Sequence, residues 1–131
     1  MKPKLSFQPL GELEQAVMEV IWGHFPTTAR EVCDRMTGRW ERAYTTIMTT
    51  MDRLHRKGLL RREKDGLAWR YEPAFSKASF EKMLADGLAA SILEAHGDTA
   101  LAAFVDAAAK VDESMLDRLR QLIERRRKGR S

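Results

Sequence analysis

One segment, residues 43–58, restricts the fold of this chain more than any other. Ile47, Met51 and Leu54 recur at helical spacing, so one face of a helix here can be buried. The opposite face carries short hydroxyl groups, one thioether and charges: Thr45, Thr46, Met48, Thr49, Asp52, Arg53 and Arg56. Threonine is a poor helix former, but hydroxyls can bond phosphates or base edges and cations neutralise phosphate. The segment therefore predicts a DNA-recognition helix; the alternative is an ordinary amphipathic surface helix.

Length and composition set the class of protein. The chain has 131 residues, and its 44% hydrophobic and 32% charged content is typical of a soluble globular protein. This length allows one compact domain, or one small domain plus an assembly module. There is no apolar run near the ~20 residues that span a bilayer, and the single Cys33 fits a reducing compartment. We expect a cytoplasmic, mainly helical protein without membrane insertion.

Charge is distributed unevenly around a net value of +4. Residues 39–71 hold nine basic and four acidic side chains, whereas residues 73–111 hold three lysines and five acids. The positive charge is thus concentrated around the predicted recognition helix, where release of counterions from DNA would favour binding. A second basic block, residues 125–128 with Arg130, either adds contacts or is the solvated end of a helix.

Two further helices are predicted before the recognition helix. Apolar residues at Leu10, Leu13, Val17 and Ile21 mark the first, which ends in the Gly and Pro of residues 23–26. A short second helix follows, capped by a threonine at position 27 or 28 with a glutamate at position 31 as capping-box partner. Residues 39–42 are expected to form a brief connection or a short strand.

After Gly58 the apolar period changes from that of a helix to that of a strand. Residues 59–73 read as two strands around a turn at Asp65 and Gly66, with Trp69 and Tyr71 alternating on the second. Three helices followed by a basic hairpin predict a winged helix-turn-helix, with the hairpin as the wing. We therefore assign residues 1–73 to a winged-helix DNA-binding domain.

Helical periodicity returns from residue 75 onward in three segments. Such short helices cannot enclose much apolar surface by themselves, and their many small residues allow close helix approach. We therefore predict that residues 74–131 form a three-helix dimerisation module with a basic tail. The alternative is a module that packs back onto the winged helix. The apolar positions expected at the dimer interface are Leu84, Leu88, Ile92, Leu101, Phe104, Val105, Leu116, Leu119, Leu122 and Ile123.

Three stretches together carry a resemblance: residues 10–22, residues 43–59 and the hairpin that ends at Tyr71. The most specific element is Tyr44, Thr45 and Thr46 followed by Arg53, Leu54, Lys57 and Gly58. In these features the chain resembles the penicillinase-repressor (BlaI/MecI) family of winged-helix transcriptional regulators. The resemblance implies a homodimeric repressor whose two recognition helices enter successive major grooves of a palindromic operator in double-stranded DNA.

The resemblance also implies roles for individual residues. The positions that read bases or contact phosphates would be Thr45, Thr46, Met48 and Thr49. Phosphate contacts would flank them at Arg42, Tyr44 and Arg53, and the wing would use Lys64 and Arg70.

A route to release follows from the same resemblance. In some members a membrane sensor-protease triggers cleavage of the repressor in its C-terminal module, which corresponds here to Ala103 and Phe104. Ala103 stands where the penicillinase repressors carry an asparagine, which departs from that pattern. The tail has no cysteine and so lacks the metal motif of copper-responsive relatives.

Catalytic and metal chemistry find no support in the sequence. His24, His55 and His96 are far apart and lack partners at zinc-ligand spacing, and Cys33 reads as a core residue. There is no glycine-rich phosphate loop or nucleophile elbow. We expect no cofactor, no metal and no enzyme. The remaining alternatives are a ligand-sensing winged-helix regulator and a winged-helix protein-interaction module.

Overall fold

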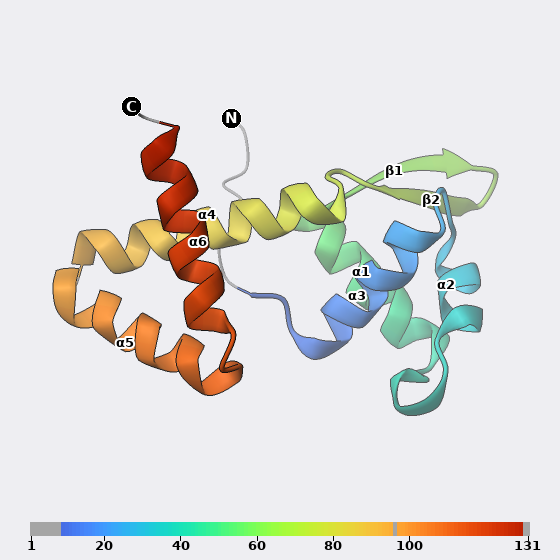
Figure 1. Cartoon of the computed structure of the whole chain (residues 1–131). Helices are drawn as coiled ribbons and strands as arrows, with labels where there is room; N and C mark the ends of the chain where they lie inside the picture. Colours follow the sequence, from blue (N-terminus) through green and yellow to red (C-terminus); the bar gives the residue numbers. More distant parts are fainter. Residues whose placement is uncertain (1–8, 96, 130–131) are drawn as a thin grey trace. The chain divides into compact units, whose positions relative to one another are not determined.

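The computed structural model describes residues 9–95 and 97–129 (Figure 1). The chain forms two compact units, one that ends at Asp86 and one that starts at Gly87. The long helix α4 (Lys77–Ala95) contributes residues to both. The boundary predicted at residues 73 and 74 falls shortly before this helix. The division of the chain into a DNA-binding domain and a dimerisation module stays a prediction.

The first two helices begin at defined caps. α1 (Glu12–Gly23) begins where the Glu14 carboxylate accepts a hydrogen bond of 3.0 Å from the Gly11 N–H. α2 (Ala29–Arg35) is capped by Thr28, whose hydroxyl oxygen accepts from the Glu31 N–H at 3.1 Å, while the Glu31 carboxylate accepts from the Thr28 N–H at 3.2 Å. These reciprocal bonds satisfy N–H groups that have no partner inside the helix. The capping box predicted around residue 28 is confirmed.

The connection between α2 and the next helix is a 3-10 turn, η1 (Gly38–Trp40). The alternative of a short strand in residues 39–42 is wrong. The hairpin has a backbone contact with the segment before α2, where Thr27 and Tyr71 exchange two hydrogen bonds of 3.0 and 2.7 Å. Gly38 opens the turn at a φ of 60°, a conformation that glycine adopts without strain.

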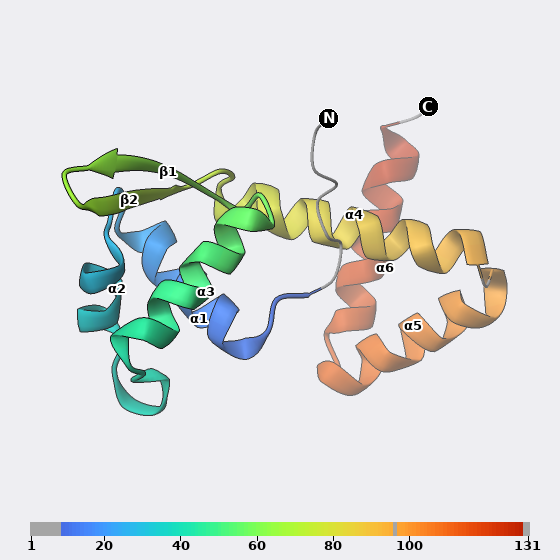
Figure 2. The same cartoon turned by 180° about the vertical axis from the view of Figure 1, so that it is seen from behind.

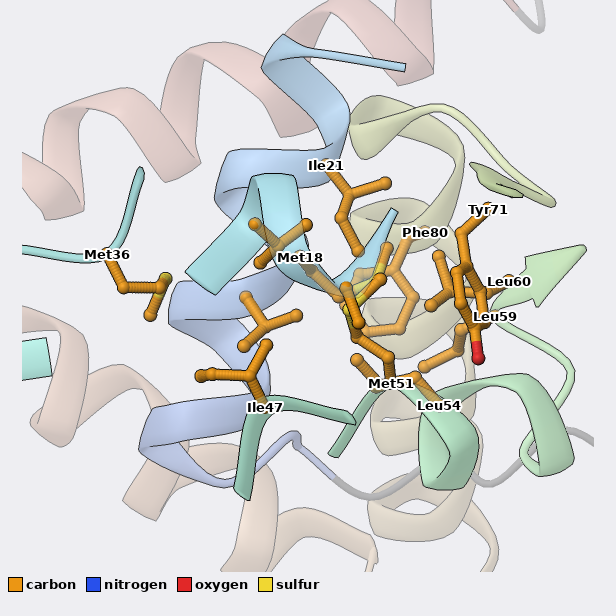
Figure 3. Close-up of a cluster of buried hydrophobic side chains, with 13 residues drawn as sticks. Met18, Ile21, Met36, Ile47, Met51, Leu54, Leu59, Leu60, Tyr71 and Phe80 are labelled. Carbon is orange, nitrogen blue, oxygen red and sulfur yellow. The ribbon is translucent and has the colours of Figure 1, made fainter. Parts of the chain in front are cut away.

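α3 (Tyr44–Arg56) is the central element of the first unit. Its apolar residues Ile47, Met51 and Leu54 are fully buried and pack against α1, including Met18 and Ile21. Figure 3 shows these side chains gathered between the helices. Burial of each such side chain stabilises the fold by about 1.5–3 kcal/mol, so the orientation of α3 about its own axis is strongly fixed.

The hairpin is the next element after α3, and the view from behind in Figure 2 shows the two strands beside the end of that helix. β1 (Leu60–Asp65) and β2 (Ala68–Pro73) are antiparallel, with Arg62 opposite Tyr71 and Lys64 opposite Trp69. Gly66 occupies the turn at a φ of 65°, as the aspartate–glycine signal predicted. Successive side chains alternate between the two faces of the hairpin, which decides which of them face α3.

The first turns of α4 belong to the core of the first unit. Phe80 is buried, with its ring centroid 5.7 Å from that of Trp22. Trp22 also donates its indole N–H to the Phe75 carbonyl at 3.0 Å. Leu84 packs, partly buried, against the same cluster. The core of the first unit therefore includes side chains well beyond Pro73.

The second unit contains the end of α4 together with α5 (Gly97–Val111) and α6 (Met115–Lys128), which pack against each other. All residues of α5 and α6 are described, and none of them is buried in the single chain. Among the residues that the structure describes, no helix combines the length and the apolar character needed to cross a bilayer.

An ion pair joins α1 to the end of α3 and generates a stability prediction. The Lys57 ammonium donates to the Glu14 carboxylate at 2.7 Å, and the Glu14 side chain is only 10% exposed. Burial acts to raise the pKa of the Glu14 carboxyl, but the hydrogen bonds from Lys57 and the Gly11 N–H outweigh it and leave this pKa lowered. A carboxyl with a lowered folded-state pKa stabilises the fold above its unfolded value of about 4.3 and loses that contribution as the pH falls through the folded value.

We predict that Glu14→Gln lowers the free energy of unfolding by about 1–2 kcal/mol at pH 7 and weakens its dependence on pH below about 5. Urea unfolding at pH 7 and at pH 3.5 measures both effects. Glu12→Gln, which alters an exposed acid of the same helix, is the matched control. Equal stability of the two variants at pH 7 would contradict the assigned role of the ion pair.

Candidate nucleic-acid interface

Burial divides the threonines of α3 into two groups. Thr45, Thr46 and Thr49 are exposed on the outward face. Thr50 is buried, and its hydroxyl donates to the Thr46 carbonyl at 2.8 Å. The outward face of α3 therefore presents three exposed side chains that carry hydroxyl groups, while the opposite side of the helix is buried in the core.

The thioether and the cations complete this face. Met48 is 42% exposed, and Arg53 and Arg56 are also exposed, so an apolar surface and two guanidinium groups accompany the hydroxyls. Asp52 is the one acid of α3, and its carboxylate is paired with Arg56 at 3.0 Å and with Arg62 at 2.9 Å. The face is thus polar and cationic, and its acid is neutralised within the fold.

Two residues predicted to contact phosphates, Arg42 and Tyr44, lie at the start of α3. Contacts with neighbouring residues orient both side chains. The Arg30 guanidinium stacks over the Tyr44 ring at 4.2 Å. Arg42 donates to the carbonyls of Arg39 and Glu41 at 2.7 and 2.8 Å, and its side chain stays exposed. Tyr44 is partly buried and packs against the core, whereas Arg42 is exposed.

One face of the hairpin is turned toward α3. Four side chains share this face: Arg62 and Lys64 from β1, and Trp69 and Tyr71 from β2. Arg62 lies opposite Tyr71 and Lys64 lies opposite Trp69, and the two positions on each strand are two residues apart. A groove of about 340 Å³ separates it from α3. The groove is lined by Met48, Thr49, Asp52, Arg62, Trp69 and Tyr71.

The two predicted wing contacts lie on different faces. Lys64 is exposed and its ammonium lies 4.5 Å above the Trp69 ring, on the side of the groove. Arg70 is on the other face, where it pairs with the carboxylates of Asp65 and of Glu31 in α2, the latter at 3.7 Å. Alternation along β2 separates Arg70 from Trp69, so of the two residues only Lys64 lies on the hairpin face that borders the groove.

Arg62 is the residue that sequence reasoning missed. It is 22% exposed, whereas Arg61 beside it is 67% exposed, and it contacts Asp52, Trp69 and Tyr71. The alternation that pairs Trp69 with Tyr71 already places positions 62 and 64 of the facing strand on the same side. The sequence therefore contained a signal for the side on which Arg62 lies. It contained no signal that Arg62 would pair with Asp52 on α3.

Residues assigned to other chemistry are dispersed. Cys33 is half-buried against the core, with its sulfur 3.6 Å from the Arg42 carbonyl oxygen. The structure groups no three histidine, cysteine or acidic side chains as a metal site within residues 9–95 and 97–129. His96 and Arg130 lie outside the described residues. Ala103 and Phe104 are exposed within α5.

Three helices with a hairpin wing, and a hydroxyl-rich cationic face on the third helix, define a winged helix-turn-helix regulator of the DNA-binding class. The sequence model of the penicillinase repressor family matches residues 10–125. The chain belongs to the penicillinase repressor family. The mainly helical winged-helix fold predicted from the sequence is confirmed.

Individual relatives agree with this assignment. The transcriptional regulator BlaI from two strains of Mycobacterium tuberculosis, CDC 1551 and H37Rv, is 34% identical over 116 residues, which cover 87% of this chain and 82% of the relative. A solution structure of the DNA-binding domain of the repressor BlaI is 28% identical, with a TM-score of 0.50, over 57% of this chain and 92% of that domain. These relatives are transcriptional regulators, so the expectation that the chain is not an enzyme is confirmed.

Proposed function

We propose that this chain is a homodimeric transcriptional repressor that occupies a palindromic promoter operator. The observation that carries the proposal is the outward face of α3, where Thr45, Thr46 and Thr49 are exposed together with Arg53 and Arg56, and where Thr49 also lines the groove beside the wing. The name of the solved relative, a DNA-binding domain of a repressor, supports the same activity for the matching unit here.

The proposed contacts follow from where the side chains lie. α3 enters the major groove, and its threonines and Met48 reach base edges or thymine methyl groups. Arg53, Arg42 and Tyr44 contact phosphates on either side. The start of α3 has no side-chain cap, so its first N–H groups suit a phosphate as well.

The wing contributes unequally to this proposal. Lys64 lies beside the groove and is assigned a phosphate contact. Arg70 is engaged by two carboxylates on the opposite face, so its role is to brace the wing against α2.

Dimer formation is proposed through the second unit. Its helices leave large apolar side chains exposed, among them Leu88, Leu101, Phe104, Leu122 and Ile123. A second copy of this chain would bury them in a two-fold interface. Leu84 is left out because it packs on the core of the first unit. The remaining predicted positions, Ile92, Val105, Leu116 and Leu119, stay in the proposed interface.

A dimer would determine the symmetry and the half-site spacing of the operator. Two linked winged helices bind more tightly than one, because the second binding event is intramolecular. Two-fold symmetry places the two α3 helices on half-sites about 34–36 Å apart, or a multiple of that spacing.

Release of the operator is proposed to involve loss of the dimer. Cleavage at Ala103 and Phe104 by a sensor-protease pathway would achieve this. Both residues lie inside α5, so cleavage there requires local unfolding of that helix first.

We predict that Arg53→Ala weakens binding to specific and random DNA alike, by about 1–2 kcal/mol, because it removes a phosphate contact. Thr49→Ala changes base preference by about 1 kcal/mol at one position of each half-site. Thr50→Ala is the matched control, since this buried threonine affects stability and leaves base preference unchanged. Anisotropy titrations with matched and mismatched duplexes measure all three.

Two outcomes would favour the alternatives to this proposal. A protein-interaction module predicts that wild type, Arg53→Ala and Thr49→Ala bind DNA equally weakly at physiological salt. If the chain is a ligand-sensing regulator, we expect the DNA affinity of the wild-type chain to change only when a small molecule is added.

We predict that Phe104→Glu converts the dimer to a monomer and lowers operator affinity at least about tenfold, since it buries a charge in the proposed interface. Sedimentation equilibrium measures the change in mass. Val111→Glu, at the exposed end of the same helix, is the control and is expected to stay dimeric. A dimer of unchanged stability in Phe104→Glu would refute the assigned interface.

A further inference from the structure

The one acid of α3 lies among the groups proposed to meet DNA. Asp52 is three residues from Thr49 and four from Met48 and Arg56, so all four share one side of the helix. A carboxylate that faces phosphates is repelled by them. The structure must therefore contain something that makes this acid compatible with the proposed function.

That partner comes from the wing and is Arg62. Its guanidinium donates to one oxygen of the Asp52 carboxylate at 2.9 Å, while Arg56 pairs with the other oxygen at 3.0 Å. Arg62 also lies 3.4 Å from the Tyr71 hydroxyl. These partners keep Arg62 mostly covered, so it is poorly placed to contact a phosphate itself.

The contacts continue from Arg62 toward the tip of the wing. The Arg62 guanidinium stacks on the Trp69 ring at 4.3 Å, and the Lys64 ammonium lies 4.5 Å from the same ring. A continuous series of contacts thus runs from Asp52 on α3, through Arg62 and Trp69, to Lys64. Cation–aromatic contacts of this kind orient both partners.

We propose that Arg62 is a positioning residue for DNA recognition: it holds the wing against α3 and cancels the charge of Asp52 inside the groove. This role rests on the proposed repressor function. With Arg62 in place, Lys64 and Arg53 approach one DNA duplex in a fixed geometry and the groove repels no phosphate. Without it, the middle of the wing loses its contact with Asp52, and Asp52 keeps only Arg56, which is largely exposed to solvent.

Arg62→Gln tests the role, with Arg61→Gln as the matched control. Arg61 precedes it on β1, faces the other side of the hairpin and pairs with Glu72 at 3.3 Å, so both variants remove one paired cation from the same strand. The probe is a short duplex that the wild-type chain selects from a random-sequence library, with random duplex for comparison. We expect Arg62→Gln to lose more than about tenfold in specific affinity, and Arg61→Gln less than about threefold. Equal losses in the two variants overturn the proposal.

Asp52→Asn tests whether Arg62 cancels the negative charge of Asp52. In the wild-type background the asparagine oxygen can still accept the hydrogen bond from Arg62 and the charge that is removed is already neutralised, so affinity for the selected duplex is expected to change by less than about twofold. In the Arg62→Gln background it is expected to restore affinity at least about threefold, because the uncompensated carboxylate is removed. An equal gain in both backgrounds contradicts the cancellation.

Hydrogen exchange of the DNA-free chain tests the wing geometry independently. Amides of β1 and β2 are expected to exchange faster in Arg62→Gln than in Arg61→Gln or wild type, while those of α1 and α3 are unchanged. Unchanged exchange in the hairpin overturns the positioning role. If wild type selects no duplex, the proposed function fails, and the exchange result still decides whether Arg62 holds the wing.

Arg62→Lys keeps the experiment decisive if Arg62→Gln does not fold. It retains the charge but loses the planar group that contacts Asp52, Tyr71 and Trp69 together. We expect affinity between that of wild type and that of Arg62→Gln, or a loss of at least about threefold if only Arg62→Lys can be measured. Wild-type affinity and wild-type hairpin exchange in Arg62→Lys overturn the proposal.

Discussion

The complete burial of one side of α3 is the constraint on which the rest of the site depends. Ile47, Met51 and Leu54 are enclosed by α1, α2 and the base of the hairpin. Rotation of the helix about its axis would expose these side chains, at a cost of several kcal/mol on the scale of about 1.5–3 kcal/mol for each. The core therefore determines which threonines face outward, although none of the threonines of the outward face belongs to it.

Electrostatic contacts then connect the separate elements to this core. Glu14 and Lys57 join α1 to the end of α3, Arg70 and Glu31 join the wing to α2, and Arg62 and Asp52 join the wing to α3. Single exposed ion pairs contribute little to stability, with a median of about 0–1 kcal/mol. Their effect here is geometric, because they orient a two-stranded hairpin that is marginally stable by itself.

Much of the fold could be predicted from the sequence because its signals are local. Helical spacing located α3, a threonine and a glutamate at capping distance located α2, and an aspartate–glycine turn located the hairpin. What could not be predicted depends on tertiary contacts. Thr27 pairs with the backbone of Tyr71, and Phe80 belongs to the core of the first unit although it lies beyond the predicted boundary.

The candidate site shows the same division. Periodicity predicted the outward position of Thr49 and Arg53, because both follow from the helix alone. It could not show that Arg70 is engaged by Glu31, or that Asp52 is neutralised by Arg62, since these partners are distant in sequence or on another element. The arginine and lysine residues proposed to contact phosphates and the arginines that support them look alike in the sequence, and only their partners in the fold distinguish the two groups.

Sequence-specific binding by α3 is tested most directly by a binding titration with the promoter DNA upstream of the gene that encodes this chain, repeated across a series of salt concentrations. A homodimeric repressor is expected to bind with two chains per duplex, with an affinity that falls steeply with salt, and in the presence of an excess of random competitor DNA. Weak binding that random competitor removes would contradict this expectation, since the face of α3 would then carry charge without sequence recognition.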